Sequence, residues 1–99
     1  MSNRKYQKGY RLEREVKIDM EAKGWVAIRA AGSKGKSKID IVAIKENTIR
    51  GIQCKANGKI LLEERRILIE NYHKHNILPL LASKERIGKR VRIKYTLLL

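Results

Sequence analysis

The stretch IDIVAIKENTIRGIQCK, residues 39–55, decides the fold. Two runs rich in β-branched residues flank a polar turn at residues 46–48, which is the pattern of a β-hairpin. The sequence therefore predicts a strand over Ile39–Ile44 and a returning strand over Ile49–Lys55. Each predicted strand also carries polar side chains among its apolar ones, so the hairpin is the first place to look for chemistry.

The rest of the chain alternates helix and strand signals around this hairpin. Leu12, Val16 and Met20 recur every four residues, which is one stripe of a helix. The alternation favours an α/β fold, a mixed five-stranded β-sheet flanked by helices, in a single domain at residues 10–99. The other expected elements are a flexible basic arm at residues 1–9, helices at Tyr10–Lys23 and Leu61–His75, strands at Trp25–Arg29, Ile77–Ala82 and Val91–Leu99, and loops at Ala30–Lys38, Ala56–Lys59 and Ser83–Arg90.

Charge narrows the choice of partner. The formal net charge is +14, from 24 Lys and Arg against 10 Asp and Glu. Such an excess is self-repulsive in a small fold unless a polyanion relieves it, so nucleic acid is the expected partner. No run approaches the roughly 18 apolar residues of a membrane span, and we expect neither a membrane partner nor a small-molecule cofactor. Cys54 is the only cysteine, which favours an intracellular location, cytoplasmic or nucleoid.

Two basic segments are candidates for DNA contacts. The arm and the glycine-containing loop before Asp40 both concentrate cations, which suits contacts to phosphates. The alternative for the loop is that it is an ordinary solvated segment. The candidate DNA-binding cations in them are Arg4, Lys5 and Lys8 in the arm, and Lys34, Lys36 and Lys38 in the loop.

The hairpin also predicts a cluster of polar side chains. Gln53 and Lys55 point to the same face because side chains alternate along a strand, and strand pairing brings Asp40 toward them. Glu13 lies at the edge of the helix stripe, where it can overhang the same patch. Oxygen ligands of this kind suit Mg²⁺, with Lys55 neutralising charge on a phosphate. The alternative is a surface acid and a strand-edge lysine without a catalytic role.

The flanking motifs carry a family resemblance. The run KGxxxERE at residues 8–15, the run GWVAIRAAGS at residues 24–33 and the run IDIVA at residues 39–43 closely resemble the archaeal-type Holliday junction resolvases, the Hjc family. The resemblance covers most of the chain. It implies the restriction-endonuclease-like fold of the PD-(D/E)xK nucleases. It also implies a homodimer that binds branched DNA and makes paired symmetric nicks in a four-way junction using Mg²⁺, with Mn²⁺ as a substitute.

The resemblance also implies roles for individual residues. Glu13 and Asp40 match the acidic metal ligands, and Lys55 matches the catalytic lysine. Cys54 matches the position whose backbone carbonyl completes the metal shell. The remaining matches are Arg14 and Arg29, basic residues near the site and the DNA backbone, and Ser33, a loop serine close to the catalytic centre.

Gln53 departs from the family pattern, which has Glu at this position. The amide keeps the shape of a glutamate and its carbonyl oxygen can still ligate a cation, but the charge is lost. We therefore expect reduced or abolished cleavage. Two other functions stay open: an inactive module of the same fold that only binds branched DNA, and a superfamily nuclease that acts on unbranched DNA.

Overall fold

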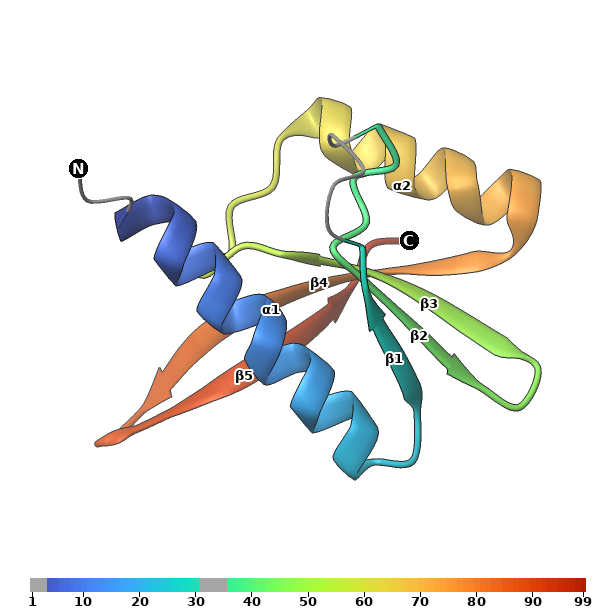
Figure 1. Ribbon diagram of the computed structural model, residues 1–99. Coiled ribbons are helices and arrows are strands. Elements are labelled where there is room, and N and C mark those ends of the chain that lie inside the picture. The colour runs from blue at the N-terminus through green and yellow to red at the C-terminus, as the bar shows by residue number, and fades with distance from the viewer. Residues whose placement is uncertain (1–3, 31–35) are drawn as a thin grey trace.

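The computed structural model describes residues 4–30 and 36–99, with side chains described from Tyr10 onward (Figure 1). It contains two helices and five strands in these ranges. The elements are α1 (Arg4–Ala22), β1 (Val26–Arg29), β2 (Ile41–Lys45), β3 (Thr48–Cys54), α2 (Leu62–His75), β4 (Ile77–Ile87) and β5 (Arg90–Leu97). No helix in the described ranges is long and apolar enough to cross a membrane.

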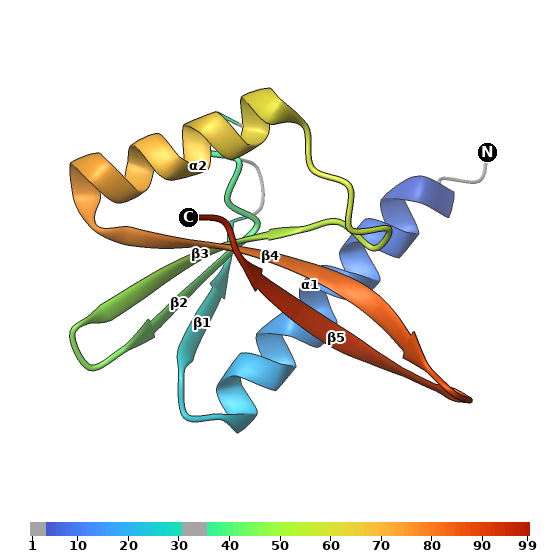
Figure 2. The same ribbon diagram turned by 180° about the vertical axis from the view of Figure 1, so that it is seen from behind.

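The strands form one mixed sheet in the order β1-β2-β3-β4-β5. Neighbouring strands are antiparallel except β3 and β4, which run parallel because the chain crosses between them through α2. The two helices cover opposite faces of the sheet, as the two opposed views show (Figures 1 and 2). The predicted fold class, a five-stranded mixed sheet flanked by helices, is confirmed.

Each helix has its own hydrophobic core against the sheet. Leu12, Val16 and Met20, the stripe that predicts α1, are at most 1% exposed and pack on residues of β1–β4 that include Ile41 and Ile52. On the other face, Leu68 of α2 packs with Ile39, Leu81 and Leu98. The two cores lie on opposite faces of the central strands, so the carboxyl end of β3 lies between the amino-terminal half of α1 and the start of α2.

One glycine in β3 is required by this packing. A Cβ built at Gly51 would lie 2.8 Å from Cγ2 of Ile77 and 2.9 Å from Cδ1 of Ile39. Both contacts are too short for carbon atoms, so a side chain here would push these residues apart. Because Gly51 has no side chain, Ile39 before β2 and Ile77 at the start of β4 can pack directly against the backbone of β3.

Two sequence expectations are wrong. Helix α1 begins at Arg4, so residues 4–9 are helical rather than a flexible arm; they are mostly good helix formers, with no proline to end the helix. The predicted loop Ser83–Arg90 is also strand: β4 continues to Ile87 and turns into β5 at Gly88. Gly88 has φ +62°, which a tight hairpin turn requires, and the many charged side chains had masked the strand pattern.

Candidate active site

Asp40 lies at the end of the sheet, directly before β2. Its own N–H donates to the carbonyl of Ile52 at 2.9 Å, which fixes its backbone to β3. Its Oδ2 accepts the backbone N–H of Cys54 at 2.8 Å. Burial raises the pKa of Asp40; the Cys54 N–H and the charge of Lys55 act against this shift, and the charge of Glu64 adds to it. The Asp40 carboxylate is therefore fixed in position, but the groups around it do not fully offset the cost of burying its charge.

Helix α1 brings a second acid to Asp40. Oε1 of Glu13 accepts a hydrogen bond from Nε of Arg29 at 3.3 Å, and the Arg29 guanidinium lies 4.5 Å from the centre of the Tyr10 ring. Burial raises the pKa of Glu13, and the nearby charge of Asp40 raises it further. The sequence placed Glu13 over the Asp40 patch, and the structure brings the two together. Two neighbouring carboxylates with raised pKa values favour a bound cation.

Gln53 and Lys55 both turn toward a residue of α2 that the sequence analysis missed. Gln53 is 4% exposed, and its Nε2 donates to Oε2 of Glu64 at 2.8 Å. The ammonium of Lys55 lies 3.1 Å from the same oxygen. The other oxygen, Oε1, accepts the N–H of Leu61 at 3.1 Å and caps α2. Burial acts to raise the pKa of Glu64, but these three donors outweigh it and hold the pKa below its ordinary value.

A sequence signal for Glu64 existed but was ambiguous. A glutamate three residues past the start of a helix is the usual mark of a capping box, so it indicates a structural role. Glu63 next to it is equally acidic, but it is exposed and pairs with Arg66. Only the packing of α2 against the end of β3 gives Glu64 a different environment from Glu63.

The oxygen atoms of Glu13, Asp40 and Gln53 are the candidate ligands for a divalent cation. Oε1 of Gln53 is buried and has no hydrogen-bond partner, which is rare for a buried carbonyl oxygen. Gln53 follows Ile52, whose carbonyl accepts the Asp40 N–H, so it lies beside Asp40 in the sheet. The carboxylates of Glu13 and Asp40 and the Gln53 amide oxygen are the hard oxygen donors that Mg²⁺ prefers. Among the described residues no group of three or more His, Cys, Asp or Glu side chains is arranged to hold a metal. The fit therefore depends on two carboxylates and the amide oxygen.

The other predicted site residues are more scattered. Cys54 contributes its backbone N–H to Asp40, while its partly buried side chain packs against the α1 core, and burial raises the pKa of its thiol. Arg14 is exposed on α1, Lys36 is exposed, and Lys38 is partly buried with φ +60°. Ser33 and Lys34 lie outside the described residues, as do the side chains of Arg4, Lys5 and Lys8.

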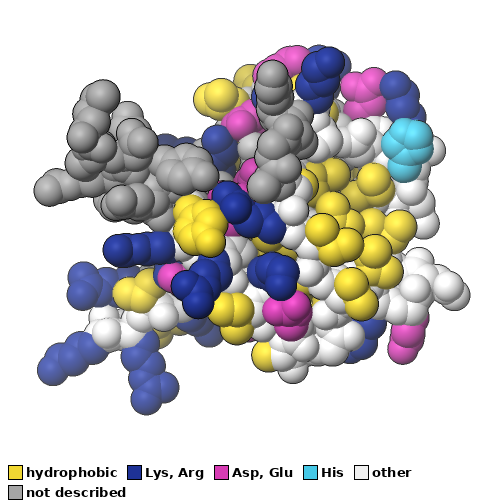
Figure 3. Space-filling model, viewed as in Figure 1, with side chains coloured by type: hydrophobic (Ala, Val, Ile, Leu, Met, Phe, Trp, Pro, Cys, Tyr) yellow, Lys and Arg dark blue, Asp and Glu magenta, His cyan; other side chains and the backbone are white. Residues whose placement is uncertain are grey.

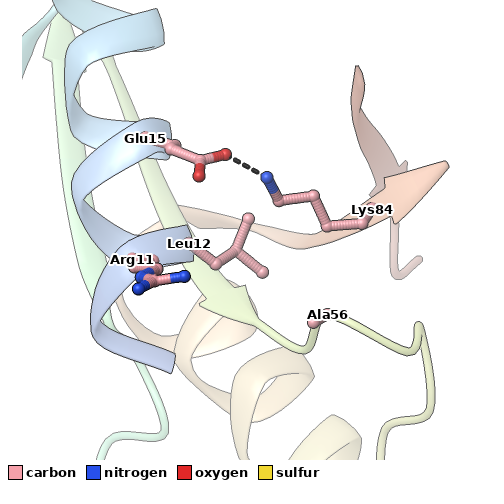
Figure 4. A pocket seen from close by; sticks show the side chains of 5 residues that line it. All are labelled: Arg11, Leu12, Glu15, Ala56 and Lys84. Atoms are coloured by element: carbon pink, nitrogen blue, oxygen red, sulfur yellow. Dashed lines mark hydrogen bonds and ion pairs between the residues drawn. The ribbon is translucent and has the colours of Figure 1, made fainter. Parts of the chain in front are cut away.

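A cleft of about 320 Å³ lies beside this cluster, between α1 and β4 (Figure 4). Its lining includes Ala56, which directly follows Lys55, and the cations Arg11 and Lys84. Lys84 pairs with Glu15 across the cleft, as the dashed line in Figure 4 marks. The cleft thus lies between α1 and the basic β4–β5 hairpin, with lining residues that directly neighbour Glu13 and Lys55 in the sequence.

Comparison with known proteins decides the family. The family model described as archaeal Holliday junction resolvase (Hjc) matches residues 4–95. The chain belongs to this family. Among Hjc proteins, the crossover junction endodeoxyribonuclease Hjc of Methanocaldococcus jannaschii is 40% identical over 55 residues, covering 56% of this chain and 39% of that protein. The aligned part is thus well under half the length of that relative.

A solved Hjc structure shows the same fold. The Holliday junction resolvase Hjc of Archaeoglobus fulgidus, an archaeal hyperthermophile, superposes with a TM-score of 0.73. The match covers 92% of this chain and 73% of that chain at 23% identity. At this identity the comparison bears on the fold, and the roles of individual side chains have to be argued from the geometry of this chain.

Proposed function

We propose that this chain is a structure-specific endonuclease that binds four-way DNA junctions and cuts them by paired symmetric nicks. The observation that carries the proposal is the set of residues at the end of β3: Asp40 fixed to the Cys54 N–H, Glu13 close enough for the charge of Asp40 to raise its pKa, Lys55 next to Gln53, and an unpaired Gln53 oxygen. Membership of the Hjc family supports the choice of a branched substrate.

In this proposal Mg²⁺ is held by the carboxylates of Glu13 and Asp40 and by Oε1 of Gln53, with Mn²⁺ as a substitute. The bound ion supplies Lewis-acid activation of the phosphodiester and of a water molecule. Asp40 is positioned for this role because the N–H of Cys54 fixes one oxygen and leaves the other available. Lys55 neutralises the charge that grows on the phosphate as water attacks and the P–O bond to the leaving oxygen breaks.

The basic β4–β5 hairpin is the proposed contact to the DNA backbone. It carries one acid, Glu85, which pairs with Arg92, and Lys84 pairs with Glu15. Lys and Arg side chains gather over α1 and the hairpin in the space-filling view (Figure 3). The hairpin cations with no ion pair to a described residue are Arg86, Lys89, Arg90 and Lys94. Contacts of this kind respond to duplex geometry rather than base sequence.

A homodimer is part of the proposal, because paired nicks need two sites. Val26 and Ile28 of β1 are 60% and 51% exposed. They share a sheet face with Ile49, through the pairs Val26↔Ile44 and Ile44↔Ile49, and α2 covers this face mainly over β4. An isologous contact between two copies would bury these side chains.

The decisive experiment compares a labelled four-way junction with a linear duplex of the same sequence. We expect paired symmetric nicks in the junction in Mg²⁺, at a rate reduced by the uncharged Gln53, and tight junction binding in the presence of excess duplex. Cutting that follows base sequence rather than branching would instead identify a nuclease of unbranched DNA. Asp40→Asn is the control for a contaminating nuclease.

A second candidate function is a junction-binding module that does not cut, which the uncharged Gln53 favours. It predicts the same preference for the junction with no nicks at any Mg²⁺ or Mn²⁺ concentration. The two functions therefore separate on cleavage alone, while loss of junction preference would contradict both.

A further inference from the structure

Glu64 accepts side-chain contacts from both Gln53 and Lys55 at the end of β3. One of its oxygens accepts from both Gln53 and Lys55, at 2.8 Å and 3.1 Å, and the other caps α2. The side chain is only 11% exposed, so these contacts are made away from bulk water. Buried carboxylates are kept where several donors converge on them, and here two of the donors are site residues.

This arrangement fixes which way the Gln53 amide faces. If the amide were flipped, Oε1 rather than Nε2 would lie 2.8 Å from the Glu64 carboxylate, and two acceptors would repel at that distance. The NH₂ group is therefore held on Glu64, and Oε1 is left as the buried oxygen without a partner. The hydrogen bond to Glu64 thus determines that the amide atom left without a partner is the oxygen and not the nitrogen.

We propose that Glu64 is a positioning residue that takes over the task of the missing carboxylate at position 53. It orients Gln53 so that its oxygen can ligate a divalent cation, and it holds Lys55 beside that oxygen. Glu64 lies on α2, an element that carries none of the residues matched to the family motif. This inference rests on the proposed metal-dependent function and names a residue that the function requires.

If Glu64 has this role, Gln53→Glu alone should weaken cation binding. A carboxylate at position 53 would lie at hydrogen-bond distance from that of Glu64, where both cannot stay ionised. The double substitution Gln53→Glu with Glu64→Gln exchanges the amide and the carboxylate and restores a donor–acceptor pair. Glu64→Gln alone leaves two amides, which no longer dictate the orientation of Gln53.

The test is cation binding without DNA, measured by calorimetry with Mn²⁺ alone and with Mg²⁺ alone. We expect Glu64→Gln to weaken Mn²⁺ binding about 10- to 100-fold, as loss of a ligand-orienting partner does. We expect the double variant to recover at least wild-type affinity and Gln53→Glu alone to fall below the double variant. Glu63→Gln is the matched control: it removes the same charge one residue away, at an exposed side chain, and should change little.

Several results would overturn the inference. Unchanged Mn²⁺ affinity in folded Glu64→Gln, or a double variant no better than Gln53→Glu, would show that Glu64 does not orient the ligand. If Glu64→Gln melts early, the comparison of the double variant with Gln53→Glu decides. A wild-type protein that cuts junctions alongside a fully active Glu64→Gln overturns this inference alone. A wild-type protein that neither binds Mn²⁺ nor prefers junctions overturns the proposed function and this inference with it.

Discussion

At the scale of single residues, Asp40 is the acid whose surroundings are best defined. Asp40→Asn keeps an oxygen to accept the Cys54 N–H, so the fold should be retained. The substitution removes the charge of a proposed metal ligand. We therefore expect the cleavage rate to fall more than about 100-fold, which exceeds the loss expected when only a residue that orients a ligand is removed. Junction affinity should stay equal or rise, because a charge that repels phosphate is lost. Single-turnover cleavage and equilibrium binding to a labelled junction measure the two effects. Full activity in this variant would mean that the catalytic site lies elsewhere.

Lys55 should separate chemistry from binding. Lys55→Ala removes the ammonium that lies 3.1 Å from Glu64, and we expect cleavage to slow by about 10²-fold or more. Junction affinity should change far less, since the chain keeps the other 23 of its 24 cations. Lys59→Ala, at a nearby exposed lysine, is the matched control. Equal losses of rate and affinity in Lys55→Ala would reduce Lys55 to a phosphate contact.

The site illustrates what residue patterns predict. Strand alternation put Gln53 and Lys55 on one face, and a helix stripe put Glu13 near Asp40, because both follow from local geometry. Glu64 could not be found this way, since its contact with Gln53 depends on how α2 crosses the sheet. Only tertiary packing distinguishes it from Glu63, its neighbour in the sequence.

At the scale of elements, α1 is tied to the sheet by a partly buried hydrogen bond as well as by its apolar stripe. The hydroxyl of Tyr95 in β5 donates to Oδ2 of Asp19 at 2.6 Å. Burial acts to raise the pKa of Asp19, but the hydrogen bonds from Lys23 and Tyr95 outweigh it, so the pKa is lowered. The same burial, with the bond to Asp19, raises the pKa of Tyr95.

Tyr95→Phe should therefore destabilise the fold by about 1–2 kcal/mol at neutral pH, the range for a partly exposed hydrogen bond to a charged group. Because the folded-state pKa of Asp19 is depressed, this stability is present above its unfolded value of about 3.9. It is lost as the pH falls through the lower folded value, so the two proteins should converge in strong acid. Urea unfolding at several pH values measures the difference, with Tyr72→Phe as control. A difference that does not change with pH would remove Asp19 from the explanation.

The elements themselves were predicted unevenly. The hairpin at residues 39–55 and α2 were predicted to within two residues, because turn residues and apolar periodicity mark their ends. The far part of β4 was not, because Lys84, Glu85 and Arg86 resemble a solvated loop when the pairing with β5 is unknown. A two-stranded ribbon that is exposed to solvent on both faces lacks the alternation of apolar and polar residues that predicts a strand.

At the scale of the whole molecule, charge should dominate affinity. A surface that neutralises 6–10 phosphates loses roughly 10³–10⁵ in affinity between 50 and 200 mM salt. We expect junction binding to fall within this range, and the preference for junction over duplex to persist at every salt concentration, because shape selects between them. Anisotropy titrations with both DNAs measure this. Junction and duplex affinities that become equal with rising salt would indicate a general basic module.

Dimerisation should depend on the apolar face of β1–β3. We expect light scattering to give the mass of a dimer, and Ile28→Lys to shift the protein to a monomer by placing a charge in the contact. Ile18→Lys is the control, since Ile18 is similarly exposed, at 54%, but lies on α1. A wild-type monomer, with and without junction DNA, would contradict the dimer.

The strand pairing of β4 is unequal along its length. From Leu80 to Ala82, β4 pairs with β3 on one side and β5 on the other. From Ser83 to Ile87 its only strand partner is β5, with one further bond from the Lys84 N–H to the carbonyl of Ala56. The amides of the free part therefore open at a lower free energy than those of β3, and they exchange their hydrogens sooner. If the proposed function holds, a basic ribbon that opens more readily than the central sheet would let one set of carboxylates meet DNA arms that cross at different angles.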